Sequence, residues 1–231
     1  MTADEFYNEF NLAYNNLASN QAPGLDKYEI SVYLTKAQTA LVDALYGKFE
    51  KSEEARRKLV NVVKTCKCTA ITVTDTNKLY YNDTDVFVNT FSLPNDLRYI
   101  VNEQVKMKDD IANECMRDKF LKVQPISHDE INTIVENPFR FNERRALRLD
   151  TSYTNNADIP YVELLTKING IDYYKIRYIK NPDPIILDIF DETIDGKVNT
   201  SGVTYLGSLP ATTHRQIVEI AAKMAYADYK S

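Results

Sequence analysis

Apolar residues recur every three to four positions over the first sixty residues, a period that predicts consecutive helices. The first runs from Thr2 to near Asn20, and Thr2 and Glu5 have the spacing of a capping box. The second runs from Asp26 to about Gly47. Its apolar stripe consists of Ile30, Leu34, Ala37, Leu41, Ala44 and Leu45. A third helix is expected after Ser52, with Ala55, Leu59 and Val62 or Val63 on its buried side.

From Cys66 onward, β-branched and aromatic residues predict strands instead of helices. The segments CTAITVTDT and VFVNTFSLP are expected to be strands joined by a hairpin loop at 75–85. The stretch from Leu97 to Met107 mostly alternates between apolar and polar positions, although Ile100 and Glu103 break the pattern. Residues 120–126 predict another strand, followed by a short helix that Ser127 opens.

The second half of the chain predicts more strands and a closing helix. Strands at 161–168 and 171–180 are expected to form a hairpin that turns at Asn169-Gly170. The segment PFRFNERRALRLD predicts a loop leading into a strand, and IILDIF a short apolar strand. Thr213 and Gln216 have capping-box spacing at the start of the last helix. Its expected buried side is Ile217, Ile220, Ala221, Met224 and Ala225.

These elements indicate an α+β fold in which N- and C-terminal helices pack together and flank a mostly antiparallel β region. We expect an N-terminal helical part at 1–65 and a β-rich part with one short helix at 66–210. The C-terminal helix at 211–231 is expected to pack back on the N-terminal helices.

Charge and composition narrow the functional classes. A formal net charge of −5 argues against tight nucleic-acid binding, which needs many Lys and Arg side chains to displace counterions. Sixteen tyrosines and no tryptophan suit wet contact surfaces as well as half-buried strand positions. The start of the chain, MTADEFYNEF, lacks the pattern of a signal peptide, and no apolar run is long enough for a membrane span. We expect free thiols and cytoplasm-like conditions.

No group of residues predicts catalysis or a cofactor. His128 and His214 each lie near a predicted helix start and beside no nucleophile motif. Cys66-Lys67-Cys68 lacks the second ligand pair of a zinc site. DETIDGKVNTSG, residues 191–202, has Gly202 where a calcium loop needs its closing glutamate, and we interpret it as an exposed loop. With six glycines and no phosphate-binding loop, no nucleotide site is expected, and we expect no enzyme, metal or cofactor.

Two groups of residues are candidates for contacts with other subunits. One is a basic cluster of Arg140, Arg144, Arg145 and Arg148 beside Phe139. On a strand, Arg144 and Arg148 would share one face and Arg145 would join Leu147 and Leu149 on the other. The arginines suit bidentate pairing with carboxylates of a neighbour, or are plainly solvated charge. The other group is Tyr28, Val32 and Tyr33, which we expect beside the stripe of the second helix.

Four segments, spread in order over most of the chain, resemble the ring-forming head-tail connector proteins of crAss-like bacteriophages. They are SNQAPGLDKYEISVYLTKAQTALV, LPNDLRYIVNEQV, VQPISHDEINTIVENPFR and HRQIVEIAAKMA. None is a catalytic signature, so the specificity of the resemblance comes from the set.

The resemblance implies a non-enzymatic virion protein assembled in the host cytoplasm, a ring homo-oligomer beneath the portal. Docking on a twelvefold portal implies a dodecamer. The expected partners are further copies, the portal protein and other connector or tail proteins, while genomic DNA passes without specific binding. A tail hub or tube component is the first alternative, and a small metal-dependent hydrolase is the second.

Overall fold

The computed structural model describes residues 1–18, 23–71, 86–111, 113–151, 160–189, 193–196 and 205–230. The chain forms two compact units. The helical unit combines Met1–Val63 with Asn181–Ser231, and the barrel unit is Lys64–Lys180. Segment 181–210 thus groups with the helices by its contacts, whereas the three-part division at 65/66 and 210/211 stays a prediction.

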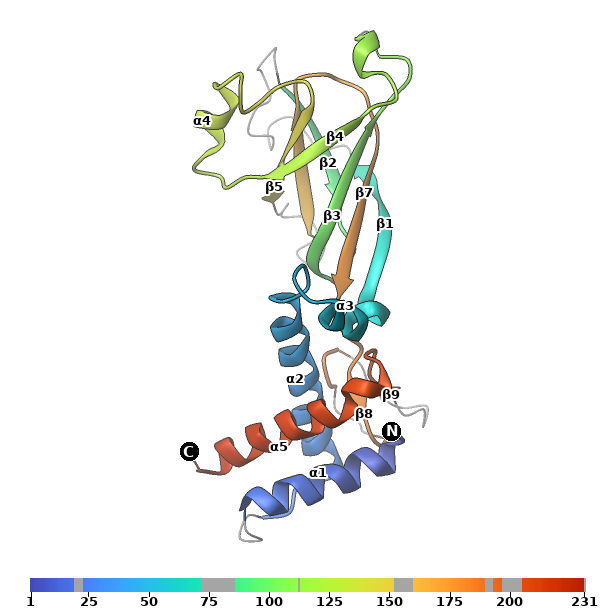
Figure 1. Ribbon diagram of the computed structural model, residues 1–231, viewed down its shortest axis with the longest axis vertical. Helices are drawn as coiled ribbons and strands as arrows, with labels where there is room; N and C mark the ends of the chain where they lie inside the picture. The colour runs from blue at the N-terminus through green and yellow to red at the C-terminus, as the bar shows by residue number, and fades with distance from the viewer. Residues whose placement is uncertain are drawn as a thin grey trace. The chain divides into compact units, whose positions relative to one another are not determined.

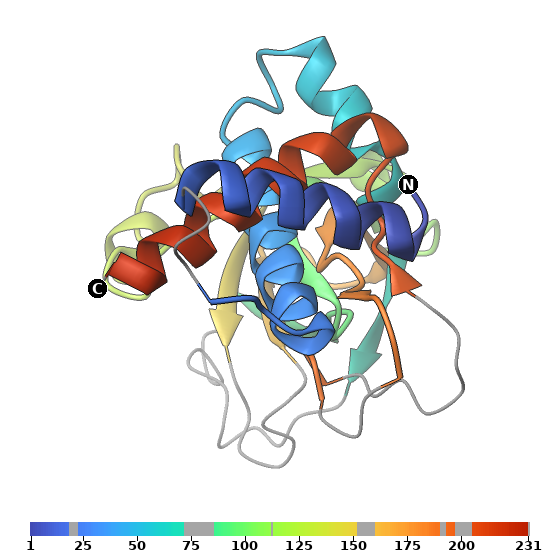
Figure 2. The same cartoon turned by 90° about the horizontal axis from the view of Figure 1, so that it is seen from below.

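The helical unit is built on α1 (Ala3–Ala18), α2 (Lys27–Tyr46), α3 (Glu53–Leu59) and α5 (His214–Lys230). Helix α5 lies beside α1 and also contacts α2 (Figure 2). The capping box expected at Thr2 is present: the Glu5 N–H donates to Thr2 Oγ1 at 3.2 Å and the Thr2 N–H donates to Glu5 Oε2 at 2.9 Å. Asp26 and Glu29 form the equivalent box at α2, and Ser52 caps α3.

A second, polar stripe of α2 is also buried. Ser31, Thr35 and Gln38 lie beside the apolar stripe and bind the backbone of a short sheet formed by β8 (Ile185–Ile186) and β9 (Tyr205–Leu206). These side chains satisfy backbone groups at the edge of a two-stranded sheet, which explains why they are buried. The contacts join Thr35 to Ile185, Ser31 to Leu187, and Gln38 to Asp183 and Ser208.

Helix α5 begins differently from the prediction. A 3-10 turn, η4 (Ala211–Thr213), precedes it, and the Thr213 hydroxyl donates to the Pro210 carbonyl at 2.7 Å. The buried side consists of His214, Ile217, Val218, Ala221, Ala222 and Ala225. Ile220 and Met224 are only partly buried, so the expected buried side was rotated from the true one.

Seven strands of the barrel unit close into a barrel in the order β1-β2-β6-β5-β4-β3-β7 (Figure 1). Among the described pairs, β4 with β5 is parallel, and β1 with β2, β2 with β6, β5 with β6, β3 with β4 and β3 with β7 are antiparallel. The strands are β1 (Val63–Ile71), β2 (Phe87–Ser92), β3 (Leu97–Met107), β4 (Phe120–Pro125), β5 (Arg145–Thr151), β6 (Tyr161–Thr166) and β7 (Ile171–Lys180). The described residues also include the short helical segments η1 (Val60–Val62) of the helical unit and η3 (Glu114–Met116) and α4 (Ile131–Val135) of the barrel unit. The α+β class with a mostly antiparallel sheet is therefore confirmed.

The hairpin predicted at Asn169-Gly170 is wrong, although both strands exist. Strand β6 pairs with β2 and β5, and β7 pairs along its length with β3. The turn is real: Gly170 has φ 112°, and its carbonyl accepts a hydrogen bond from the Lys108 N–H at 2.9 Å. An added Cβ there would lie 2.4 Å from Ile111 Cγ2, so the position also needs a residue without a side chain.

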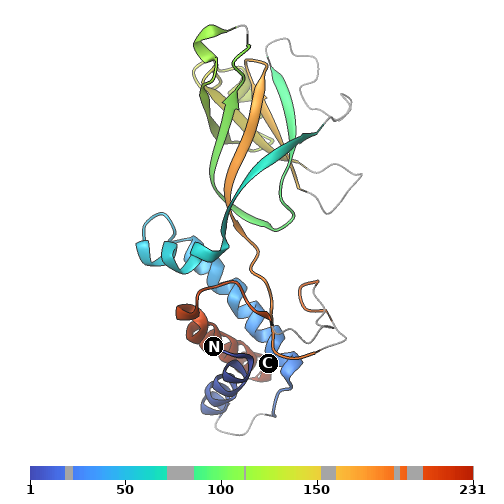
Figure 3. The same ribbon diagram turned by 90° about the vertical axis from the view of Figure 1, so that its right-hand side faces the viewer.

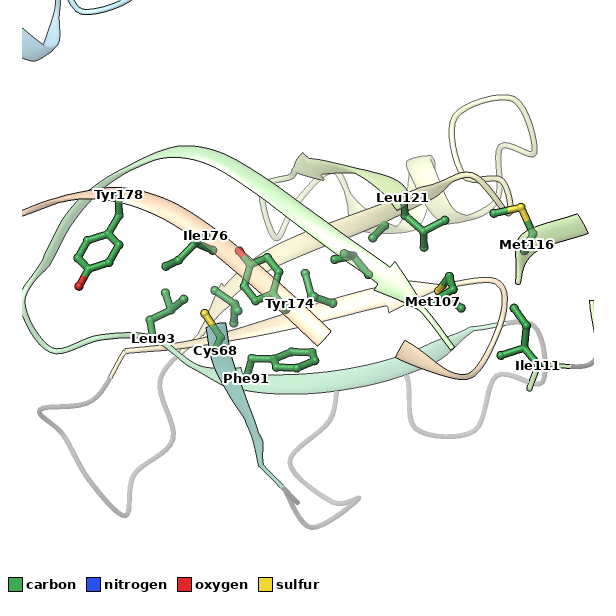
Figure 4. Packing of buried hydrophobic residues seen from close by; sticks show 14 residues of the cluster. Cys68, Phe91, Leu93, Met107, Ile111, Met116, Leu121, Tyr174, Ile176 and Tyr178 are labelled. Carbon is green, nitrogen blue, oxygen red and sulfur yellow. The ribbon is translucent and has the colours of Figure 1, made fainter. Parts of the chain in front are cut away.

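The barrel interior explains the irregular pattern of β3. Register shifts against β7 between Leu97 and Tyr99 and between Ile100 and Asn102 change which side chains face inward. Ile100 therefore packs against the core, while Val105 and Met107 are fully buried in it. Figure 4 shows this core around Tyr174, whose ring centroid lies 5.5 Å from that of Phe91.

Candidate interaction surfaces

The three candidates on α2 are all half-buried in the subunit. Tyr33 donates its hydroxyl to Asp228 Oδ2 of α5 at 3.0 Å, and Lys36 Nζ lies 5.7 Å from the centroid of its ring. Burial, and then the Asp228 carboxylate, raise the pKa of the Tyr33 phenol. Tyr33 thus joins α2 to α5, and its contact with a neighbouring subunit, like that of Tyr28 and Val32, stays a prediction.

The turn at Phe139 and Arg140, which we call the tip, is held in place by hydrogen bonds to Asn137. Asn137 Oδ1 accepts from the Phe139 N–H at 3.0 Å, and the Asn137 carbonyl accepts from the N–H groups of Arg140 and Phe141 at 3.0 and 2.9 Å. Phe141 is fully buried, whereas Phe139 is 86% exposed. The tip presents an aromatic ring beside an exposed guanidinium, the residue types enriched at binding hot spots.

The other three arginines do not share one surface. Arg144 is exposed and precedes β5, whereas Arg145 is partly buried and its Nη1 donates to the Arg140 carbonyl at 3.2 Å. Arg148 has its guanidinium in an ion pair with Glu103. The face expected to show Arg144 and Arg148 together to solvent is not formed, because the inward-facing positions of β5 turn Arg148 into the barrel.

Inside the barrel, Arg148, Glu103 and Tyr174 form a connected polar group. The Arg148 and Glu103 side chains are each 11% exposed and form an ion pair. The Tyr174 hydroxyl donates to Glu103 Oε2 at 2.6 Å, and Arg148 Nε lies 3.1 Å from Asp150 Oδ1. Burial, and then Glu103, raise the pKa of the Tyr174 phenol far above its ordinary value. This arrangement gives both buried charges a partner, as such charges require.

Sequence reasoning missed that basic side chains gather on the neighbouring strands β1, β7 and β3, although Lys106 among them pairs with Asp118. Figure 3 shows these three strands side by side. Lys67 Nζ of β1 and Lys106 Nζ of β3 lie 4.7 and 6.0 Å from the ring centroid of Tyr173 on β7. A shallow groove of about 220 Å³ lies on the same strands and is lined by Thr65, Asn102, Gln104, Lys175, Ile176 and Arg177. The alternation of each strand was visible in the sequence, but the order of the three strands was not.

The residues considered for chemistry have structural contacts. His128 Nε2 lies 2.8 Å from the Asp150 carbonyl, and His214 is 7% exposed with its ring centroid 4.9 Å from that of Phe6. In the part of the chain that the structure describes, no cluster of three or more His, Cys, Asp or Glu side chains could hold a metal ion. The loop at 75–85, and most of the 191–202 loop, lie outside the described residues.

Among the described residues, no helix combines the length and apolar character needed to cross a bilayer.

Comparison with known proteins gives a consistent result over the whole chain. Residues 1–231 match the family described as phage tail ring protein 3/4. The chain is 35% identical to "Ring protein 3" of Bacteroides phage crAss001, over 97% of this chain and 95% of that protein. It is 31% identical to "Ring protein 4/5" of the same phage, over 100% of this chain and 94% of that protein.

Proposed function

The chain belongs to the phage tail ring protein 3/4 family, and we propose that it is a structural virion protein that forms a homo-oligomeric ring in the head-tail connector of a crAss-like phage. The ring lies below the portal and lines the conduit for genomic DNA. The observation that carries this proposal is the full-length match to two ring proteins of one crAss-like phage. A ring beneath a twelvefold portal would contain twelve copies, assembled in the host cytoplasm.

Ring formation needs a heterologous interface, in which one patch of each subunit meets a different patch of the next. We expect the helical unit to supply part of this interface and the Phe139 and Arg140 tip to reach another tier of the connector, since an exposed aromatic ring on a hydrogen-bonded turn loses little conformational freedom on binding. Arg144 extends this patch with a second exposed guanidinium. Arg148 is not part of it, because its guanidinium pairs with Glu103 inside the barrel.

The charge distribution is compatible with DNA passing through the ring. Residues 64–180 contain as many Lys and Arg as Asp and Glu, so the whole net charge of −5 comes from the segments of the helical unit. A surface without net positive charge does not hold a phosphate backbone tightly, because binding strength follows the number of neutralised phosphates. We therefore propose no specific DNA site, and the family match supports a structural and not an enzymatic role.

Immunogold electron microscopy of purified phage particles tests the location. Antibody raised against this chain should label the junction of head and tail, and label along the tail would instead favour a hub or tube component. Absence of label on particles, with signal in lysed infected cells, would overturn the virion assignment. The hydrolase alternative is tested on duplex and single-stranded DNA with Mg²⁺ and Mn²⁺, where we expect no cleavage.

A further inference from the structure

A groove on the helical unit has apolar side chains along its floor. It lies between the C-terminal half of α2, helix α3 and helix α5, and has a volume of about 340 Å³. Leu41 is nearly buried, but Leu45 and Ile220 are only partly covered and Ala44 is exposed. The complete lining is Leu41, Ala44, Leu45, Lys48, Ser52, Glu54, Ala55, Lys58, Gln216, Glu219, Ile220 and Lys223.

Lysines from α3, from α5 and from the turn after α2 surround this groove. Lys58 is bound to Glu54 at 2.6 Å and Lys48 helps to lower the pKa of the same carboxylate, whereas neither Lys48 nor Lys223 forms an ion pair among the described residues. The three lysines outnumber the two carboxylates of the lining, Glu54 and Glu219, so the groove has a net positive charge beside an apolar floor. A ligand for the groove would combine an apolar side chain with carboxylates.

Helix α1 of a second copy has this combination on its outward side. The helix contains Asp4, Glu5 and Glu9 and no basic residue. Its buried side is Phe6, Phe10, Tyr14 and Ala18. Glu5, Glu9, Leu12 and Asn16 follow at helical spacing along the opposite side, which we call the α1 ridge. Leu12 is 65% exposed although it lies in a helix whose other side is well packed.

We propose that the α1 ridge of one copy docks in the groove of a second copy and forms the contact between neighbouring subunits. The inference rests on the proposed ring function and names the two surfaces that meet. Leu12 covers the apolar floor near Leu45 and Ile220. Glu5 and Glu9 lie against Lys48 and Lys223. The contact is heterologous and both of its patches lie in the helical unit, so it can repeat from copy to copy.

Two exposed surfaces are candidates for the groove, the α1 ridge and the tip at Phe139, and their charges distinguish them. The tip carries Arg140 and precedes Arg144, and these guanidiniums would meet Lys48 and Lys223 in the groove. Like charges brought together in an interface oppose association, whereas the acidic ridge complements the same lysines. The groove therefore selects α1 over the arginine-bearing tip.

The first experiment measures the concentration at which the recombinant chain forms rings, by mass photometry and negative-stain microscopy. Leu12→Glu and Ala44→Arg should raise this concentration about tenfold or more, because each places a charge on the apolar contact. Ile189→Glu is the matched control, an exposed apolar residue of the same unit at 59% exposure that belongs to neither surface, and it should assemble as the wild type does.

A charge exchange tests the pairing itself. Glu9→Lys and Lys223→Glu should each weaken assembly several-fold, and the double variant should recover most of the loss. All variants should keep the wild-type melting temperature, since Leu12, Ala44 and Lys223 are exposed and Glu9 is only partly buried. Rings that form normally in both Leu12→Glu and Ala44→Arg would overturn the docking proposal and leave the ring function standing.

The same contact can be tested in virions. This experiment applies even if the isolated chain stays monomeric, because the particles contain the assembled protein. A carbodiimide joins carboxylates to nearby lysines, so treatment of particles should give dimer-sized bands containing Glu5 or Glu9 linked to Lys48 or Lys223. Dimer bands linked only through other residues would overturn the docking proposal. Particles that lack the chain altogether would instead overturn the proposed function.

Discussion

The ion pair between Arg148 and Glu103 inside the barrel allows a direct test of how buried charges affect the stability of this fold. We consider Arg148→Met, which keeps most of the aliphatic packing of the side chain and removes the guanidinium. Glu103 would then remain as a carboxylate that is 11% exposed and keeps the hydrogen bond from the Tyr174 hydroxyl. The change therefore leaves a buried charge without its counterion.

The expected cost follows from the burial of both partners. Removing one member of a buried ion pair typically costs about 3 to 5 kcal/mol, since the remaining charge keeps its desolvation penalty. The hydrogen bond from Tyr174 persists, so we expect a loss near the lower value, about 3 kcal/mol. The double variant Glu103→Gln with Arg148→Met carries no buried charge and retains an oxygen that accepts from Tyr174. It should recover about 2 kcal/mol of that loss.

Urea unfolding of the three proteins, followed by circular dichroism and tyrosine fluorescence, measures the free energies of unfolding. Hydrogen exchange in β3, β5 and β7 then assigns the change to the barrel. A single variant within 1 kcal/mol of the wild type would show that the pair is effectively solvated, roughly as surface pairs are. A double variant as unstable as the single one would show that lost packing, and not the unpaired carboxylate, is responsible.

Two further predictions concern titratable groups. At pH 8 a thiol reagent should modify the exposed Cys115 rapidly and Cys68 only after unfolding, because burial raises the pKa of the Cys68 thiol to about 12; peptide mass spectrometry would contradict this if native Cys68 were labelled early. Burial lowers the pKa of His214 in the folded chain. As the pH falls below about 6.5, this histidine therefore binds a proton in the unfolded chain before it does so in the folded chain. Stability should therefore fall from pH 6.5 downward by at most about 1.4 kcal/mol per unit from this group, and thermal melts of His214→Gln should show a shallower fall. An equal slope in both proteins would exclude His214 as the cause.

Local signals in the sequence predicted local structure well. The capping spacings at Thr2 and Asp26 marked true helix starts, and the change of period near Cys66 marked the passage from helices to strands. Asn169-Gly170 correctly predicted a turn, but it said nothing about which strand each arm would join. In a closed barrel the partner is set by the whole strand order, and β7 is long enough to pair along the eleven residues of β3.

The candidate surfaces were predictable only where a residue's environment is local. The exposed Phe139 and Arg140 tip depends on a short turn around Asn137. The burial of Arg148 depends instead on a carboxylate, that of Glu103, forty-five positions away in the sequence. The break in alternation at Glu103 was the one sequence signal of that pair. It could not be interpreted without the register shift after Ile100, beyond which Glu103, Val105 and Met107 face inward.

The two stripes of α2 show why an amphipathic pattern alone does not identify a subunit contact. Its apolar stripe is buried at Ile30, Leu34 and Ala37 but uncovered at Ala44, because α5 presents Ile220 only partly to the same region. Its polar stripe, which a pattern of apolar positions would assign to solvent, is instead buried and forms hydrogen bonds to the backbone in and beside β8 and just after β9. Both deviations lie on one helix: the hydrogen bonds of its polar stripe hold the N-terminal part of α2 against β8, and its apolar C-terminal end is left open as the floor of the groove. The surface that we propose for a second copy is therefore the part of the apolar stripe that the subunit's own helices leave uncovered.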